Sequence, residues 1–253
     1  MFNYFKYNIF YRLDSPERTI FHAKIIRKKY FLRKLYYEWY NILTKIKPLL
    51  PKGKMIEIGS GGGFLKEIEP SILCTDIIDL PTNDLTFSAL NMPFQDNELS
   101  CIFMIDTFHH IPDAKQFLNE VNRVLKKNGL LIMIEPANTL WGRFIFKNFH
   151  HEPFEVNGDW SFPISGPLSG ANGALPWIVF KRDSKKFKSL FPNLKLLDFQ
   201  YHTPLRYLLS GGLSFKQFVP DFSYKLFYLI DKYLALFSCQ LSMFVTIKIK
   251  KLN

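Results

Sequence analysis

The sequence predicts an α/β domain in which helices cover both faces of a mostly parallel β-sheet. Two observations indicate this fold class. Short apolar segments alternate with helical ones between residues 54 and 135, and those apolar segments lack the polar alternation of a half-exposed strand. A hydrophobic content of 47% and a charged content of 22% over 253 residues are typical of a globular chain. A chain of this length buries a large core without a disulfide or a structural metal.

An amphipathic helix is expected within the first 50 residues. Ser15 is a good N-cap and Pro16 suits the first helical position. Apolar residues then recur every three or four positions over residues 20–46, with one break and an end near Pro48. The outer face carries five basic residues: Arg27, Lys28, Lys29, Arg33 and Lys34. We expect a solvated face on a packing helix, with docking to an anionic surface as the alternative. Residues 1–50 are therefore predicted to form an N-terminal helical extension.

Strands and helices alternate through the middle of the chain. Apolar runs predict strands at 55–58, 72–75, 87–90, 101–105 and 130–134. Helical patterns lie at 64–68 and at 113–127, where Asn128 and Gly129 are expected to end the second helix. Together these segments form the repeating unit of a parallel sheet.

The periodic pattern fails over residues 136–182, which are rich in aromatic residues, glycine and proline. A loop of this length inside a compact domain is commonly functional, so we expect an active-site loop region here. Further on, the sequence predicts a helix at 185–190 and strands at 194–201 and 241–249. A helical insertion at 207–238, with its main helix near 224–236, separates these last two strands.

The net charge of +11 is unevenly spread. Residues 1–50 carry 11 Lys or Arg against 3 Asp or Glu, and residues 136–253 carry 15 against 7, whereas residues 51–135 carry 7 against 12. Charge alone does not choose among anionic lipid, phosphorylated substrates and nucleic acid. No apolar run reaches the roughly 20 residues of a membrane span without helix breakers. We therefore expect a cytoplasmic protein, with peripheral contact at the inner membrane surface as an open alternative.

The most informative segment runs from Glu57 to Gly63 and reads ExGxGxG. Glycines directly after a strand let the backbone turn sharply and let a ligand approach the main chain. Asp76 closes the next strand, where a carboxylate suits the two hydroxyls of a ribose. A dinucleotide fingerprint needs a small residue where this chain has Phe64. The pattern thus favours a nucleoside without phosphates and disfavours a nicotinamide oxidoreductase.

Residues 52–135 resemble the core of class I S-adenosylmethionine-dependent methyltransferases, close to the methyltransferase type 11 group. The resemblance rests on five blocks in order: Glu57-x-Gly59-x-Gly61-x-Gly63, Asp76, Leu90-Asn91-Met92-Pro93-Phe94 with Asp96-Asn97, Asp106-Thr107-Phe108-His109-His110, and Glu120-Val121-x-Arg123-Val124-Leu125-Lys126-x-x-Gly129. It implies a Rossmann-like, doubly wound sheet of seven mostly parallel strands with an antiparallel last strand. Residues 51–253 would form this domain.

The resemblance also assigns roles around S-adenosylmethionine. Gly59 and Gly61 would lie under its methionine part and ribose, with Ser60 and Gly63 in the same loop. Glu57 would support that loop, Asp76 would take the ribose hydroxyls, and Asp106 would face the methionine end. The family often has Asp-Ala where this chain has Ser88-Ala89. We therefore expect Asn91 and Met92 to contribute to adenine recognition.

Catalytic groups are expected near the acceptor. His109 and His110 match a pair common in the type 11 group, and they either act near the acceptor or pack at the turn after the fourth strand. For an oxygen acceptor, His110, His151 and Glu152 are the candidate bases, although His151 and Glu152 could equally form a loop salt bridge. Metal-dependent catechol-type enzymes have Asp-Asn where this chain has Glu135-Pro136. The sequence therefore predicts no metal.

These features predict transfer of a methyl group from S-adenosylmethionine to a small-molecule, lipid or glycan acceptor, by in-line displacement with the acceptor held in position. The flanks are distantly similar to bacterial methyltransferases associated with surface polysaccharide synthesis. A catalytically silent binding module of the same fold is one alternative. An RNA methyltransferase is another, favoured by the basic ends but disfavoured as a nucleic-acid base enzyme because Asp106-Thr107-Phe108-His109 replaces the expected Asp-Pro-Pro-Tyr block. The sequence leaves the oligomeric state open.

Overall fold

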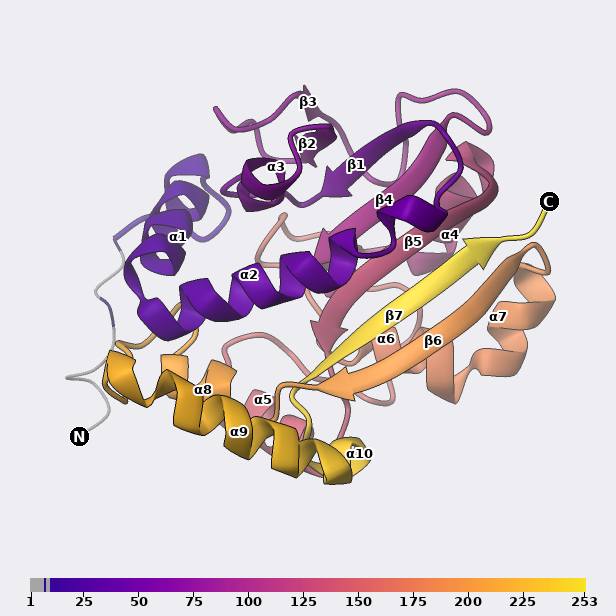
Figure 1. Ribbon diagram of the computed structural model, residues 1–253. Coiled ribbons are helices and arrows are strands. Elements are labelled where there is room, and N and C mark those ends of the chain that lie inside the picture. The colour runs from indigo at the N-terminus through magenta and orange to yellow at the C-terminus, as the bar shows by residue number, and fades with distance from the viewer. Residues whose placement is uncertain (1–6, 8–9) are drawn as a thin grey trace.

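A computed structural model describes residue 7 and residues 10–253, so part of the predicted N-terminal extension lies outside the described residues. Its centre is a seven-stranded sheet with the order β3-β2-β1-β4-β5-β7-β6 (Figure 1). The strands are β1 (Lys54–Ile58), β2 (Ile72–Asp76), β3 (Leu85–Thr86), β4 (Leu99–Ile105), β5 (Leu125–Pro136), β6 (Leu194–His202) and β7 (Phe244–Lys251). Six of the seven predicted strand regions overlap a strand of this sheet, and the seventh, at 87–90, lies directly after β3.

The strand directions confirm the predicted fold class. β1 through β5 pair in parallel, whereas β7 is antiparallel to both β5 and β6. Strand β4 and residues 130–134 of β5 are buried on both faces because helices cover both. The carboxyl ends of the parallel strands point toward the side of the molecule that carries α1, α5 and α8 (Figure 1). In an open α/β sheet this edge is where ligands bind.

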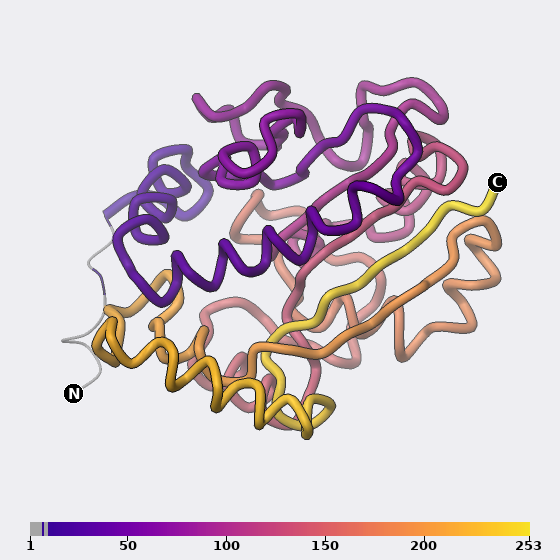
Figure 2. Tube along the Cα trace, in the orientation of Figure 1, coloured from indigo at the N-terminus to yellow at the C-terminus, as the bar shows by residue number. Residues whose placement is uncertain are grey.

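Helices lie on both faces of the sheet and beyond its carboxyl end. In Figure 1, α2 crosses in front of the strands and α4 lies behind them, and the tube in Figure 2 follows the same path. The α-helices are α1 (Pro16–Lys28), α2 (Tyr30–Thr44), α3 (Phe64–Ile68), α4 (Ala114–Val124), α5 (Leu140–Phe149), α6 (Leu175–Trp177), α7 (Ser184–Leu190), α8 (Arg206–Ser210), α9 (Tyr224–Leu234) and α10 (Ser238–Leu241). Leu35 and Trp39 of α2 and Phe117 of α4 are fully or almost fully buried, so the core lies on both sides of the sheet.

The N-terminal helix begins and breaks as predicted, but one basic residue was misassigned. The Ser15 hydroxyl accepts a hydrogen bond from the Arg18 N–H at 3.3 Å, and the chain breaks between α1 and α2 at Lys29. Lys29 is only 5% exposed, and its Nζ donates hydrogen bonds to the carbonyls of Gly212 and Phe215. The prediction that Lys29 belongs to a solvated basic face is therefore wrong, because the 207–238 insertion covers it.

Two element boundaries also differ from the prediction. Strand β3 covers Leu85–Thr86 rather than residues 87–90, which follow it without regular structure. Helix α4 ends at Val124 rather than running to residue 127, and Leu125 already has extended backbone as the first residue of β5. The buried side chain of Leu125 faces Leu99 in the sheet, and this pairing outweighs the helical pattern of the lysines that follow.

The region 136–182 contains regular helical segments as well as irregular ones. It contains α5, α6 and a short π-helical segment, Ile178–Arg182, which its mixed composition conceals. Backbone hydrogen bonds attach it to the core, from the Ala114 N–H to the Trp160 carbonyl at 2.9 Å and from the Phe162 N–H to the Pro112 carbonyl at 3.0 Å. Asp14 accepts further bonds from two backbone N–H groups of this region. The region thus closes over the carboxyl edge of the sheet.

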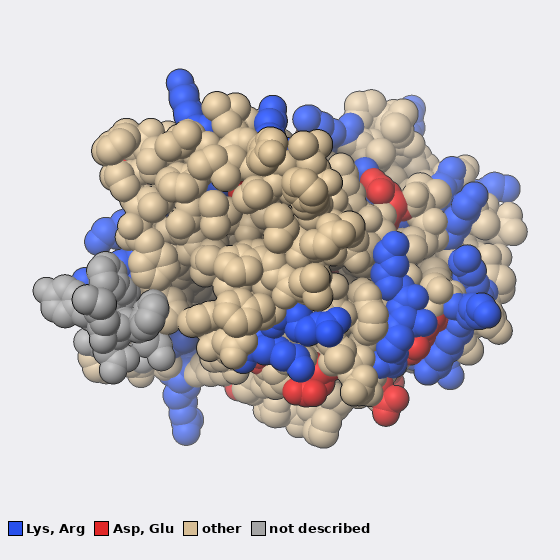
Figure 3. Space-filling model, turned by 90° about the horizontal axis from the view of Figure 1, so that it is seen from below, with Lys and Arg blue, Asp and Glu red and all other residues tan. Residues whose placement is uncertain are grey.

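The insertion between β6 and β7 packs on α2 and leaves an apolar face exposed. Arg206 of α8 is bonded to Glu38 of α2 at 2.8 Å and to Asp231 of α9 at 2.6 Å. The exposed large apolar residues of this segment are Phe218, Phe222, Leu226, Leu229, Tyr233, Leu236 and Phe237. Seen from below, the upper left and centre of the molecule carry few charged side chains. Most of the Lys and Arg side chains in this view lie on the right (Figure 3). None of the described helices is long and apolar enough to cross a membrane.

Candidate active site

A cavity of about 820 Å³ lies at the carboxyl ends of β1, β2 and β4. Its volume is within the range of small-molecule sites. Residues of α1, α5 and the insertion line the side opposite the strands, and the lining is predominantly apolar. Four carboxylates face this apolar space: Glu57, Asp76, Asp106 and Glu152. The arrangement suits a ligand that combines apolar surface with cationic or hydroxyl groups.

The turn between β1 and α3 brings bare backbone to the cavity. Gly59, Gly61 and Gly63 have φ angles of +72°, +48° and +69°, which favour glycine. A Cβ added to Gly59 would overlap the side chain of Thr107, whereas one added to Gly61 would meet only Thr19 Cγ2, at 3.5 Å. Gly61 therefore leaves space that a ligand can fill, and any side chain there would occupy it.

Asp76 lies directly against this turn. Its Oδ2 accepts a hydrogen bond from the Gly61 N–H at 3.1 Å, and its Oδ1 accepts one from the Ile78 N–H at 3.0 Å. Burial raises the pKa of Asp76, and these backbone donors act in the opposite direction. The carboxylate is thus fixed in orientation at the cavity wall with lone pairs left for a ligand.

Glu57 and Asp106 are buried carboxylates that favour a cationic ligand. Glu57 is 1% exposed, and no described residue donates a hydrogen bond to its Oε2. Burial raises the pKa of Glu57 well above its ordinary value and that of Asp106 to about 7. Both shifts are caused mainly by loss of water, which disfavours the ionised form. A cation bound between these groups would reverse that cost, so the residues fit the amino and sulfonium groups of S-adenosylmethionine.

Three of the predicted cofactor residues, Asn91, Met92 and Gly63, do not line the cavity. Asn91 is exposed and Met92 is buried, and neither lines the cavity; the Met92 N–H is bonded to Glu120 at 2.7 Å. Ser88, Ala89 and Leu90 line the cavity beside them, and the role of Asn91 and Met92 in adenine recognition stays a prediction. The Ser60 hydroxyl bonds the Glu57 carbonyl and the Thr75 N–H, so it supports the turn. Gly63 caps α3 and is absent from the cavity lining.

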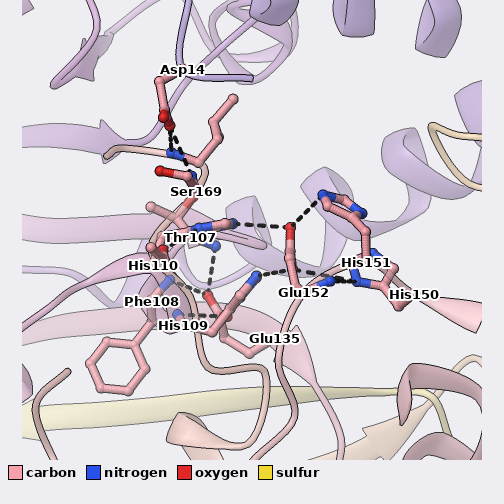
Figure 4. A network of polar contacts seen from close by, with 12 residues as sticks. Asp14, Thr107, Phe108, His109, His110, Glu135, His150, His151, Glu152 and Ser169 are labelled. Carbon is pink, nitrogen blue, oxygen red and sulfur yellow. Dashed lines mark hydrogen bonds and ion pairs between the residues drawn. The ribbon is translucent and has the colours of Figure 1, made fainter. Parts of the chain in front are cut away.

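The predicted catalytic residues gather at the other end of the cavity (Figure 4). His110 Nε2 lies 3.6 Å from Glu152 Oε1, and His151 Nε2 lies 3.7 Å from the same oxygen. Burial lowers the pKa of His110 to about 4, whereas the neighbouring histidines hold the pKa of Glu152 far below its ordinary value. The loop 136–182 therefore brings Glu152 to the pair that follows β4.

Two residues of this cluster were not among the predicted site residues. His109 is fully buried, with Nδ1 2.7 Å from Glu135 Oε2 and Nε2 3.2 Å from Glu152 Oε2. Glu135 also accepts the backbone N–H groups of Thr107 and Phe108, at 3.0 and 2.7 Å. The sequence signal for His109 was its place in the pair with His110. The sequence held no comparable signal for Glu135, because a single acidic residue at the end of a buried strand is compatible with many roles.

Aromatic side chains from α5 and α2 form part of the cavity lining, and the sequence predicted only some of these elements. Trp141, Phe144 and Phe149 of α5 line the cavity, and Phe144 and Phe149 are also about half exposed. Tyr36 and Tyr40 of α2 also line the cavity. Their three- and four-residue spacing identified the helix, but the same spacing serves a core or a cavity wall.

The family model described as "Methyltransferase domain" matches residues 56–133. The chain is 37% identical over 49 residues to the demethylmenaquinone methyltransferase of Staphylococcus saprophyticus, covering 19% of this chain and 21% of that one. It is 30% identical over 100 residues to the same enzyme of Staphylococcus carnosus, covering 40% of this chain and 39% of that one. The matched segments thus span less than half the length of either relative.

Solved structures share the fold at low sequence identity. The geranyl diphosphate C-methyltransferase of Streptomyces coelicolor A3(2) aligns with a TM-score of 0.50 at 12% identity, covering 94% of this chain and 86% of that one. The [4+2]-cyclase SpnF aligns with a TM-score of 0.50 at 11% identity, covering 85% and 80%. At these identities the likeness concerns the fold, because one fold hosts different chemistries.

The sheet order, the glycine turn and the acid beside it define a class I methyltransferase fold. Together with the family match, they identify residues 56–133 as the core of a methyltransferase domain of the type 11 group. S-adenosylmethionine is the cofactor of this class, and the glycine turn and the carboxylates fit it as described above.

Proposed function

We propose that this protein transfers a methyl group from S-adenosylmethionine to an apolar small-molecule acceptor. The observation that carries the proposal is the hydrogen bond from the Gly61 N–H to Asp76, which joins the glycine turn to the acid at the wall of a large cavity. When bound, S-adenosylmethionine supplies a methyl group on a positively charged sulfur that leaves as a neutral thioether.

Each end of the cofactor site has a separate task. Asp76 accepts hydrogen bonds from the ribose hydroxyls, and Gly61 leaves room for the sugar. Glu57 and Asp106 stabilise positive charge at the methionine end, since their burial makes an unpaired carboxylate costly. Holding cofactor and acceptor in line contributes on the order of 7–11 kcal/mol to catalysis.

The cavity walls favour an apolar acceptor. Trp141, Phe144, Phe149 and Ile164 line the space beyond the predicted cofactor residues, and three of these four side chains are more than half exposed. The polar cluster of His110, His151 and Glu152 would hold a single oxygen or amine of such an acceptor. The two relatives named as demethylmenaquinone methyltransferases support an acceptor of this kind.

A lipid surface is the proposed source of the acceptor. The apolar face of α9 carries exposed leucines, and Lys225 and Lys232 lie on the same helix. Apolar side chains beside lysines suit the interface of an anionic membrane, where the former enter the lipid and the latter contact the headgroups. Phe218 belongs both to this segment and to the cavity lining, so the surface adjoins the acceptor site.

Turnover with methyl-labelled cofactor tests the proposed function. The protein is incubated with separate apolar and polar small-molecule extracts and with total RNA, and products are identified by mass spectrometry. We expect label in an apolar product, and we expect Gly61→Arg to abolish it because the arginine fills the cofactor space. Label in RNA, or cofactor binding without any product, would replace this proposal with one of the two alternatives.

A further inference from the structure

Five of the six histidines of the chain lie around a single carboxylate. Four imidazole nitrogens surround Glu152: His109 Nε2 at 3.2 Å, His110 Nε2 at 3.6 Å, His150 Nδ1 at 3.6 Å and His151 Nε2 at 3.7 Å (Figure 4). The fifth, His22, lines the same cavity and is electrostatically coupled to Glu152. Such a concentration of one residue type around one acid calls for a chemical reason.

The imidazole rings of His109 and His110 are each held by a hydrogen-bond acceptor at Nδ1, on the side of the ring away from Glu152. His109 Nδ1 lies 2.7 Å from a carboxylate oxygen of Glu135, and His110 Nδ1 lies 2.9 Å from the Gly170 carbonyl oxygen. Both partners are acceptors, so both Nδ1 atoms carry the hydrogen. In the neutral rings the Nε2 lone pairs are therefore the free ones, and both are directed at Glu152. A carboxylate or carbonyl behind each imidazole is the support that metal-ligating histidines have.

The spacing of these atoms fits one metal ion. Ligands at about 2.0–2.2 Å from a tetrahedral zinc lie roughly 3.3–3.6 Å from one another. His109 Nε2 and His110 Nε2 lie 3.2 and 3.6 Å from the nearest Glu152 oxygen, and the ligand atoms of the three residues all lie within 4.8 Å of one another. Two imidazoles and one carboxylate suit zinc-like transition metals better than magnesium or calcium, which prefer oxygen ligands.

We propose that His109, His110 and Glu152 bind one divalent transition-metal ion of the zinc class at the acceptor end of the cavity. His110 and Glu152 line the cavity, so the open coordination position of a three-ligand site faces it. That position fits an oxygen of the acceptor, a use that rests on the proposed function, whereas metal binding itself does not. The sequence predicted no metal because Glu135 and Pro136 replace an Asp-Asn pair; here Glu135 instead supports His109.

Metal titration of the tag-free, full-length chain tests this proposal. The protein carries Cys239→Ser, because Cys239 is a free, exposed thiol and thiolates are metal ligands. After removal of metal with a chelator, ZnCl2 binding is measured by calorimetry and CoCl2 binding by visible absorption. We expect one ion per chain, with cobalt bands of low-symmetry coordination. Absence of saturable binding would overturn the proposal and leave the cluster as an ion-pair network held by a proton on His109.

Variants locate the ion. Glu152→Gln and His110→Gln should each weaken zinc binding by at least about tenfold, the size of effect seen even for supporting residues. His202→Gln is the matched control, since the His202 ring is hydrogen-bonded to Thr203 and Thr246 and does not line the cavity. Loss of binding in His151→Ala with retention in His110→Gln would contradict the assignment, as would equal binding by all variants. Circular dichroism checks that each variant is folded.

The same samples separate this inference from the proposed function. Binding of S-adenosylhomocysteine is measured with and without zinc, because the glycine turn and the proposed metal ligands are different residues. Cofactor binding without zinc binding would reject the metal site alone. Zinc binding without cofactor binding would reject the methyltransferase assignment and leave the metal site in place.

Discussion

The backbone N–H of Gly61 donates a hydrogen bond to the Asp76 carboxylate across 3.1 Å, joining the turn after β1 to the end of β2. The two residues are separated by helix α3, yet the parallel pairing of β1 and β2 brings their carboxyl ends together. This contact places an oriented acid beside unshielded backbone at the cavity. It is the local geometry on which the proposed cofactor site depends.

Asp106 should make cofactor affinity depend on pH. Its pKa is raised to about 7 by burial, so a large fraction is protonated at pH 6. Cationic S-adenosylmethionine favours the ionised carboxylate, and its binding should therefore release a proton. By linkage, affinity rises by up to about tenfold from pH 6 to pH 8 and then levels off. Calorimetry across this range measures it. Asp106→Asn should bind more weakly, with the slope removed; an unchanged slope would assign the proton to another group.

Lys29 should make stability depend on pH. Burial lowers its pKa to about 7, below the value of about 10.5 expected in the unfolded chain. Between these values the unfolded state binds more protons, so the free energy of unfolding should increase as pH rises from 7 to 10. Urea denaturation at several pH values tests this against Lys29→Met, which should lose that component. Lys28→Met, at an exposed neighbouring position, should keep the wild-type dependence. Parallel curves for Lys29→Met and wild type would refute the assignment.

The apolar face of α9 should contribute to lipid binding. Leu226 and Leu229 of this helix are 58% and 62% exposed. Replacing both with serine should weaken sedimentation with anionic lipid vesicles by about tenfold, since each leucine would otherwise be removed from water. Leu197→Ser is the matched control, because Leu197 is also about half exposed but lies on β6. Equal loss in the control, or no vesicle binding by wild type, would exclude a lipid surface as the partner.

The features that the sequence predicted best are those that depend only on residues close together in the chain. The turn from Glu57 to Gly63 and the helix after it follow from glycines and local periodicity, and Asp76 follows from its place at the end of a strand. The Ser15 cap is likewise a local signal. These features need only neighbours within a few residues, so a single sequence suffices to predict them.

What the sequence missed depends on contacts between distant segments. Lys29 is buried only because the insertion carrying Gly212 lies over it, and Glu152 meets His109 across 43 positions of the chain. Asn91 and Met92 belong to a block typical of the family, yet neither lines the cavity. Helix α5 was not predicted because its aromatic residues and glycine obscure the helical periodicity of its apolar residues. Such outcomes follow from tertiary packing, which periodicity alone does not specify.

Calorimetry with S-adenosylhomocysteine tests the central claim most directly. Wild type and Asp79→Asn, an exposed acid three residues from Asp76 and outside the cavity lining, should bind alike. Asp76→Asn should bind at least about tenfold more weakly, because hydrogen bonds to a charged group contribute about 1.5–3 kcal/mol. Absence of binding by wild type at millimolar ligand, or equal affinity in Asp76→Asn, would contradict the assignment of this cavity to the cofactor.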